Sequence, residues 1–304
     1  METILIVGRQ ILIMFLYMAI GFALYKGKLI SREGSKSMAH LLLYCILPCV
    51  IVRSFCVSRT PGNTSALIWS IVLAAAMLAI AMLLSAVLFR HSPVDNFGAA
   101  FSNAGFMGFP LIAALLGSEA VFYAAGFVAL LNALQWTYGQ FVLTGDRKQI
   151  SLKAIVKNPI IISLAIGLMI FFSGFKLPSI ASDVVGALAT LNAPIAMIVL
   201  GVYLAQTDLK KAIFTPRLYG VSMVRLVLIP VLTCLLLLLI PAQYKAIGLT
   251  LAIAAAAPIG SNVAVYAQKL NLDYTYAVET VCISTLLSII TMPVIVGVLQ
   301  LVLI

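Results

Sequence analysis

Long apolar stretches, separated by short polar or Pro/Gly-rich breaks, run along the whole chain. A helix needs roughly 20 mostly apolar residues to cross the hydrocarbon core of a bilayer. The pattern therefore predicts ten membrane-spanning helices, which we number spans 1 to 10 in chain order. Their approximate bounds are 4–25, 38–56, 66–89, 96–117, 120–143, 159–175, 184–205, 217–240, 246–268 and 275–302.

The composition agrees with this pattern and excludes whole classes of protein. Of the 304 residues, 63% are hydrophobic and only 9% are charged, and the mean hydropathy is +1.16. A soluble domain, with about 25% charged residues, can cover its surface with them, whereas this chain cannot. A water-soluble enzyme, a nucleic-acid-binding protein and a secreted disulfide scaffold are excluded. The sequence predicts an all-α integral membrane protein, and the first apolar stretch is expected to stay as a span.

Basic residues are distributed unevenly between the two sides of the membrane. With the N-terminus outside, thirteen basic residues fall on the inner side, five fall on the outer side, and Arg225 remains inside span 8. Positive charge is enriched on the cytoplasmic side of membrane proteins, so the bias predicts a multi-pass protein with both termini outside. The inner group is Lys26, Lys28, Arg32, Lys36, Arg90, Arg147, Lys148, Lys153, Lys157, Lys210, Lys211, Arg217 and Lys269.

Short sequence matches recur 146 or 148 residues apart and keep the same order. They pair Ala19-Ile20-Gly21 with Ala165-Ile166-Gly167, Lys28-Leu29 with Lys176-Leu177, Pro48 with Pro194, and Pro110 with Pro258. The matches indicate a duplication of five spans, covering 1–143 and 159–304, with a cytoplasmic linker at 144–158. Because five is odd, the second copy enters the membrane from the opposite side. This is the inverted-repeat plan of secondary transporters.

Spans 4 and 9 occupy corresponding positions in the two repeats and are the least suited to continuous helices. Proline removes one N–H donor and clashes with the carbonyl four residues earlier, and glycine loosens the backbone. Lipid cannot satisfy the backbone groups that are freed. We therefore expect helix breaks near Pro110 and Pro258. The residues that favour these breaks are Gly105, Gly108 and Pro110 in span 4, and Pro258 and Gly260 in span 9.

Polar side chains lie beside both expected breaks. A half-helix that begins there directs free N–H groups and the positive end of its dipole toward the middle of the membrane, where an anion is stabilised. The pattern predicts a substrate site lined by Ser102, Asn103, Ser261 and Asn262, with Asn132 of span 5 as the next contributor. The alternative is a pair of proline kinks whose polar residues only tie helices together.

Two ionisable side chains fall inside spans, where an unpaired charge is costly. Arg225 in span 8 and Glu279 in span 10 lie at similar depths from the cytoplasmic end. One interpretation is a buried ion pair, or a snorkelling Arg225 with Glu279 at the headgroup edge. The functional alternatives are Arg225 as the counter-charge of an anion and Glu279 as a proton-coupling carboxylate.

Other polar residues have simpler interpretations. His40 is expected at the membrane interface. Gln135 and Asn192 are expected to form interhelical hydrogen bonds, which is also the alternative to a site role for Asn132. The five cysteines occur in apolar runs without metal-ligand spacing, and we expect packed thiols.

Five segments carry a resemblance to a known family. They are LLLYCILP ending at Pro48, SNAGFMGFPL at 102–111, RLVLIP at 225–230, AAAAPIGSNVAVYA at 254–267 and STLLSIITMP at 284–293. Together they resemble the auxin efflux carrier family, which includes the plant PIN-type auxin exporters and bacterial carriers of organic acids. The resemblance covers the whole chain, and the last two segments are the most specific.

This resemblance implies ten helices in two inverted five-helix repeats, similar to the fold of bile-acid/sodium symporters, with helices 4 and 9 crossing at Pro110 and Pro258. It also implies a scaffold of helices 1, 2, 6 and 7, which holds Pro48 and Pro194, and a transport unit of helices 3–5 and 8–10. The long cytoplasmic loop of many plant members is missing here, so neither regulation through that loop nor auxin as the physiological substrate is implied.

The sequence thus predicts a secondary transporter of small organic anions in a bacterial inner membrane, working by an elevator or alternating-access mechanism. Mono- and dicarboxylates, auxin-like acids among them, are the expected substrates. No cofactor or nucleic acid is expected, H⁺ or Na⁺ is left open as the coupling ion, and a homodimer is left open. The alternative is a channel or ligand-sensing protein on the same scaffold. An ATP-driven pump or an intramembrane enzyme is disfavoured, because no nucleotide-binding loop or catalytic motif occurs.

Overall fold

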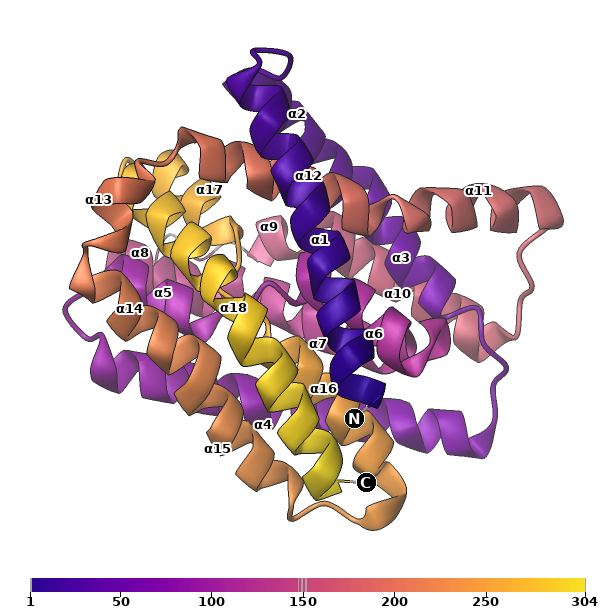
Figure 1. The fold of residues 1–304 in the computed structure, drawn as a ribbon. Helices are drawn as coiled ribbons and strands as arrows, with labels where there is room; N and C mark the ends of the chain where they lie inside the picture. Colours follow the sequence, from indigo (N-terminus) through magenta and orange to yellow (C-terminus); the bar gives the residue numbers. More distant parts are fainter. Residues whose placement is uncertain (1, 147, 149, 151, 304) are drawn as a thin grey trace.

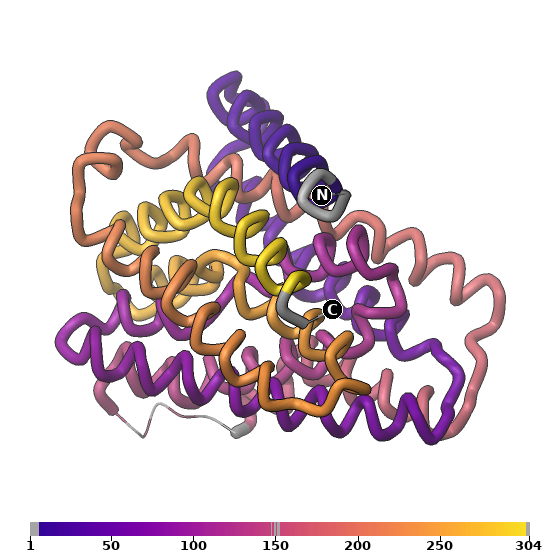
Figure 2. Tube along the Cα trace, turned by 60° about the horizontal axis from the view of Figure 1, so that its bottom comes forward, coloured from indigo at the N-terminus to yellow at the C-terminus, as the bar shows by residue number. Residues whose placement is uncertain are grey.

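The computed structural model of the chain describes residues 2–146, 148, 150 and 152–303, so Arg147 and part of the predicted linker lie outside the described residues. In the described part every regular element is helical, and the all-α class predicted from the sequence is confirmed. Figure 1 shows the helices packed side by side, and Figures 1 and 2 both show the start of the first helix and the end of the last on the same side of the molecule.

Short π-helical or 3-10 turns, labelled η, join many of the α-helices. In the first half the elements are α1 (Glu2–Lys26), α2 (Arg32–Leu41), η1 (Leu42–Ile46), α3 (Leu47–Ser54), α4 (Pro61–Leu88), α5 (Pro93–Ala100), η2 (Ala104–Gly108), α6 (Phe109–Leu116), η3 (Ser118–Ala120), α7 (Val121–Leu134), η4 (Gln135–Gly139) and α8 (Gln140–Thr144). In the linker and second half they are α9 (Leu152–Val156), α10 (Pro159–Ser173), α11 (Ser179–Thr190), α12 (Asn192–Gln206), α13 (Leu209–Ile213), α14 (Pro216–Met223), η6 (Val224–Leu228), α15 (Ile229–Leu237), η7 (Ala242–Tyr244), α16 (Lys245–Ala256), α17 (Asn262–Lys269) and α18 (Tyr274–Leu303).

Seven helical stretches of the described residues are long and apolar enough to cross a membrane. They are Ile6–Lys26, Arg32–Ser54, Pro61–Leu88, Ser118–Thr144, Ser179–Gln206, Pro216–Leu237 and Tyr274–Leu301, and they correspond to predicted spans 1, 2, 3, 5, 7, 8 and 10. The other three predicted spans are shorter, because α10 has 15 residues and spans 4 and 9 are interrupted. The chain is therefore a multi-pass membrane protein.

Three π-helical turns each end two residues before a proline. The turn η1 precedes Pro48, η2 precedes Pro110 and η6 precedes Pro230. A proline ring clashes with the carbonyl four residues earlier and donates no hydrogen bond. A π turn shifts the hydrogen-bond register by one residue, which moves that carbonyl away from the ring. These three segments therefore continue through their prolines as helices.

The helices α1 and α12 cross with almost no side chain between them. A Cβ atom on Gly21 would lie 2.1 Å from the carbonyl oxygen of Ile198, and one on Gly201 would lie 2.0 Å from that of Met18. Small residues allow membrane helices to approach this closely. The helix α3 packs against α10 and α11, and η1 contacts α3, α10 and α12, so these elements form one packed group that we call group A (α1, η1, α3, α10, α11 and α12).

The remaining long helices form a second packed group. The helix α4 packs against α5, α7, α15 and α16, and α18 packs against α14, α16 and α17. We call these elements, together with η2, α6 and η6, group B. Its buried side chains include Phe97, whose ring contacts those of Phe101 and Tyr266.

A buried carboxylate ties three helices of group B together. Asp95, in the first turn of α5, is 1% exposed and accepts hydrogen bonds from the Arg217 Nε (2.7 Å) and the Tyr276 hydroxyl (2.7 Å). The Arg217 Nη2 lies 2.6 Å from the same carboxylate. Asp95 therefore joins α5 to α14 and α18. Asp95 lies beside the expected start of span 4, where the apolar pattern does not distinguish a buried carboxylate from a solvated one.

Replacing Asp95 by alanine is expected to destabilise the protein by about 2–3 kcal/mol, because the Tyr276 hydroxyl and the partly exposed Arg217 both lose their acceptor. Tyr276→Phe removes one hydrogen bond and leaves the ion pair, so it should cost only about 1.5 kcal/mol. Thermal unfolding of the two purified variants measures both losses. Equal losses would contradict a role for the ion pair.

Candidate functional site

Two unwound segments cross in the buried interior, one between α5 and η2 and the other between α16 and α17. The Asn103 N–H donates to the Pro258 carbonyl (2.7 Å), and the Gly260 N–H donates to the Phe101 carbonyl (3.0 Å). An isolated antiparallel bridge also joins the two segments. Each segment therefore satisfies backbone groups of the other, which lipid could not do.

Side-chain hydrogen bonds complete this crossing. The Ser102 hydroxyl donates to the Ala254 carbonyl (2.9 Å), and the Ile259 N–H donates to the Ser284 hydroxyl (3.2 Å). The segments approach so closely that a Cβ atom on Gly260 would lie 3.1 Å from the Ser102 carbonyl oxygen. Glycine at this position allows the close backbone approach.

The first break lies earlier in the chain than the sequence predicted. The expected position was near Pro110, yet α5 ends at Ala100 and helix resumes at Ala104. Gly105 and Gly108 lie within η2, and Pro110 lies in the first turn of α6. The expectation at Pro110 was wrong because the π turn accommodates the proline. In span 9, Pro258 and Gly260 both lie in the unwound segment itself.

A small cavity of about 30 Å³ lies beside the crossing. All five residues proposed from the sequence for the substrate site line it: Ser102, Asn103, Asn132, Ser261 and Asn262. Each of these side chains is buried or half-buried. Leu43, Leu47 and Ile160 line the wall that η1, α3 and α10 provide. The cavity therefore lies between the broken helices and group A.

The amides around this cavity are only partly paired. The Asn262 Nδ2 donates to the Gln135 Oε1 (2.8 Å), and the Asn132 Nδ2 donates to the Val128 carbonyl (2.8 Å). Within the described residues, neither the Asn103 Nδ2 nor the Gln135 Nε2 has a hydrogen-bond partner, and both atoms are buried. Gln135, which is expected from the sequence only as an interhelical tie, does not line the cavity itself, but its side chain holds that of Asn262, which does.

The second half-helix of each broken span begins at this cavity. Asn103 immediately precedes η2 and Ser261 immediately precedes α17, and both residues line the cavity, so the N-terminal ends of the two half-helices face it. The first N–H groups of a helix have no partner within it, and they carry the positive end of the helix dipole. An anion in the cavity would be stabilised by both ends together with the amide donors.

The sequence of this chain matches those of known proteins. A family model described as "Membrane transport protein" matches residues 6–153 and 146–296. The chain belongs to this family. It is the auxin efflux carrier-type family that the five sequence segments resemble, and the prediction of that family is confirmed.

Two relatives have names that describe transporters. A protein named "Putative malonate transporter" from Rhizobium meliloti (strain 1021) is 29% identical over 268 residues, covering 82% of each chain. A protein named "Uncharacterized transporter" from Methanothermobacter thermautotrophicus is 28% identical over 200 residues, covering 64% of each chain. The description of the family and the names of both relatives are those of transporters.

In this family member, Arg225 does not line the small cavity. Its side chain is 2% exposed and lies where α5 and α16 end. The Nη1 donates to the carbonyls of Ala99 (3.0 Å) and Ala100 (3.3 Å), and the Nη2 donates to the carbonyl of Ala255. The guanidinium of the transporter therefore joins the C-terminal ends of both first half-helices.

Glu279 of the transporter lies apart from Arg225. It is 4% exposed, and its Oε1 has no hydrogen-bond partner among the described residues. Among the described residues, Arg225 and Glu279 form no ion pair with each other, so the interpretation of the two as a buried ion pair was wrong. Sequence depth alone could not reveal this, because two residues at one depth can face different helices.

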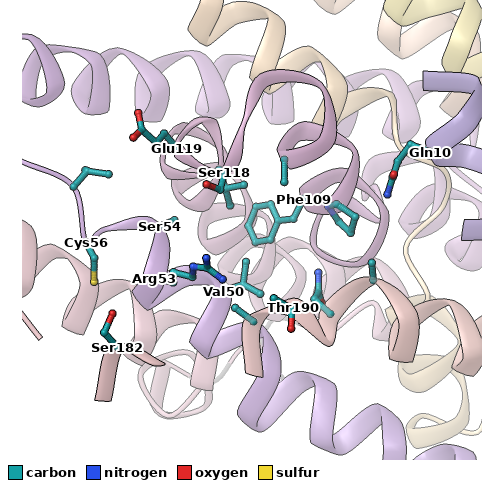
Figure 3. A pocket seen from close by; sticks show the side chains of 17 residues that line it. Gln10, Val50, Arg53, Ser54, Cys56, Phe109, Ser118, Glu119, Ser182 and Thr190 are labelled. Atoms are coloured by element: carbon teal, nitrogen blue, oxygen red, sulfur yellow. The ribbon is translucent and has the colours of Figure 1, made fainter. Parts of the chain in front are cut away.

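A second and larger cavity, of about 570 Å³, opens between groups A and B of the transporter. Figure 3 shows Arg53 reaching into it, with Phe109 facing it from another element. Glu119 lies at its edge, and Asn192 also lines it. Pro194 lies in the first turn of α12, close to this wall, and Pro48 lies in the first turn of α3.

Asn192 separates the large cavity from the small one. Its Nδ2 donates to the carbonyl oxygen of Gly105 (2.9 Å), a residue that lines the small cavity. In the π register of η2 that carbonyl would accept a hydrogen bond from residue 110, and Pro110 has no N–H to donate. Asn192 therefore supplies the donor that proline lacks, and the expectation of an interhelical hydrogen bond is confirmed.

Proposed function

We propose that this transporter carries small carboxylates across the membrane by alternating access, with the substrate bound at the crossing of the two broken helices. The observation that carries the proposal is the small cavity, where two half-helix N-termini meet the unpaired amide donor of Asn103. Carboxylates form charge-assisted hydrogen bonds with such donors. Ser102, Asn103, Asn132, Ser261 and Asn262 would contact the substrate.

A dicarboxylate is the substrate class that the comparisons favour. The relative named "Putative malonate transporter" matches 82% of the chain at 29% identity. A malonate-like anion has two carboxylates a few ångströms apart, which suits two half-helix ends that face one cavity. We take malonate as the first compound to test, with succinate and acetate as longer and singly charged comparisons.

The size of the small cavity supports a mechanism with moving parts. A buried water needs about 10–15 Å³, so a cavity of about 30 Å³ holds about two waters and no dicarboxylate. Binding requires group B to separate from the wall formed by Leu43, Leu47 and Ile160. In our proposal group A is the scaffold and group B is the transport unit, and the large cavity provides access from one side.

The proposal includes ten transmembrane helices in two inverted repeats. Spans 4 and 9 would cross as broken helices, and α10 would be the sixth span. The position of the two chain ends on one side agrees with an even number of crossings (Figure 1). With the excess of basic residues placed inside, both ends and the large cavity face the outside of a bacterial inner membrane.

Transport by the purified protein in liposomes tests this proposal. Vesicles loaded with unlabelled malonate should accumulate labelled malonate from outside above its equilibrium level, because a carrier exchanges substrate across the membrane. The initial rate should saturate as external malonate rises. Protein-free vesicles and vesicles loaded with an equal concentration of choline chloride are the controls.

Other outcomes identify the alternatives. Flux that rises linearly with concentration and shows no exchange would indicate a channel. Binding of a carboxylate without any flux would indicate a ligand sensor. Either result would reject the carrier proposal.

A further inference from the structure

Arg225 occupies an unusual position for a positive charge in a membrane protein. The last carbonyl groups of a helix have no partner within it and carry the negative end of the helix dipole. Here two such ends meet, because α5 ends at Ala100 and α16 ends at Ala256. The Arg225 guanidinium donates to carbonyls of both ends, at Ala99, Ala100 and Ala255.

In transporters with broken helices, unwound carbonyls and half-helix C-terminal ends commonly coordinate the coupling cation. The end of α5 and the end of α16 together have the chemistry of such a site. A covalently attached cation already fills it, since the side chain of Arg225 is 2% exposed. No carboxylate lies in an ion pair with it within the described residues, so the carbonyls and the two dipoles are its counter-charge.

Charges at both ends also hold α5 in place. Asp95 lies in its first turn, where a negative charge is favourable, and Arg225 lies at its last turn, where a positive charge is favourable. Arg217 binds Asp95, and Arg217 and Arg225 lie on one continuous helical stretch formed by α14 and η6. The Arg225 guanidinium is therefore held to the crossing by the same stretch. Because it is part of the chain, it cannot dissociate into the solution as a bound ion can.

We propose that Arg225 is a built-in cation that takes the place of a dissociable coupling cation, so that the transporter moves its anion without sodium. The expectation of sodium-independent transport rests on the proposed carrier function. The position of the Arg225 guanidinium between the two helix ends does not depend on that function. A sodium ion at the same carbonyls would be repelled by the guanidinium. The planar fork of arginine suits this position, because it reaches carbonyls of two different helices at once.

The first arm of the test uses the unaltered protein. Malonate exchange and malonate affinity are measured in sodium chloride and in choline chloride of equal concentration. We expect the two affinities to agree within about twofold. An affinity or exchange rate at least tenfold higher in sodium would overturn the inference while leaving the carrier proposal intact.

The second arm needs no transport and therefore remains decisive if the carrier proposal fails. Arg225→Ala should leave an empty cation site between the two half-helix ends and lower the melting temperature by about 5 °C or more. Guanidinium chloride far below denaturing concentration, or sodium chloride, should restore part of this loss. Choline chloride and urea at equal concentrations should not. An Arg225→Ala protein with no cation-dependent recovery would overturn the inference.

Two further variants serve as controls. Arg53→Ala also removes a guanidinium that donates to a backbone carbonyl, that of Gly186 (3.1 Å), but at an exposed position. Its melting temperature should not respond to guanidinium or sodium. Arg225→Lys keeps the charge and loses the fork, so it should melt below the unaltered protein and stay insensitive to sodium. If Arg225→Ala does not fold, the melting temperature of Arg225→Lys decides the question. A melting temperature that rises with sodium would overturn the inference, and one that does not change with sodium would support it.

Discussion

Replacing Asn103 or Asn262 by alanine is expected to weaken carboxylate binding by one to two orders of magnitude. A hydrogen bond from an amide to a carboxylate contributes about 1.5–3 kcal/mol, and about 1.4 kcal/mol corresponds to a factor of ten in the dissociation constant. The Asn103 Nδ2 has no partner among the described residues, so substrate binding breaks no existing bond there. Equilibrium binding of labelled malonate to the purified variants measures the loss.

The stability of the two variants should differ, which separates binding from folding. Alanine at 103 removes a buried donor without a partner, so the melting temperature should stay equal or rise. Alanine at 262 leaves the Gln135 Oε1 without its hydrogen-bond donor and should lower the melting temperature. Asn96→Ala is the matched control, because Asn96 is buried in the same broken span and accepts a hydrogen bond from Tyr138 without lining the cavity. Unchanged affinity in both Asn103→Ala and Asn262→Ala would show that the site lies elsewhere.

Alanine at Gly21 or Gly201 should produce the largest loss of folded protein. The added Cβ atom would lie 2.1 Å or 2.0 Å from a backbone oxygen of the facing helix, so α1 and α12 must separate. Overpacking of this kind costs about 1–3 kcal/mol when flexible side chains can adjust, and more when backbone is the obstacle. We expect a loss of about 3 kcal/mol or more for each variant, measured by thermal unfolding and by the yield of monodisperse protein.

Gly8 supplies the matched control on the same helix. A Cβ atom built there has no other atom within 4 Å, so Gly8→Ala should be neutral or slightly stabilising. The same substitution at two positions of α1 would then give opposite results. Equal behaviour of the two glycines would mean that α1 and α12 do not cross at Gly21.

Much of the candidate site could be predicted from local sequence. Glycine, proline and amide side chains in a stretch that is otherwise apolar leave backbone groups that lipid cannot satisfy. These features point to Asn103 and Asn262, and the structure brings both residues to one cavity. The length of the apolar stretches likewise predicts the long helices.

The position of the first break could not be predicted in the same way. A proline can end a helix or can follow a π turn, and the sequence pattern around Pro110 does not distinguish the two. The unwound segment is stabilised instead by Pro258 and Gly260, which lie far along the chain and exchange backbone hydrogen bonds with it. The break therefore lies where a partner segment is available.

Local sequence is enough to predict an all-helical membrane protein of a transport family, the segments apolar enough to enter the bilayer, and the polar residues that interrupt them. The partners of the charged residues, in contrast, depend on how the helices pack. Arg225 faces helix-end carbonyls instead of Glu279, and Asp95 joins three helices. The physical reason is that burial in lipid depends on the composition of one segment, whereas a buried charge is stabilised by groups that other segments bring to it.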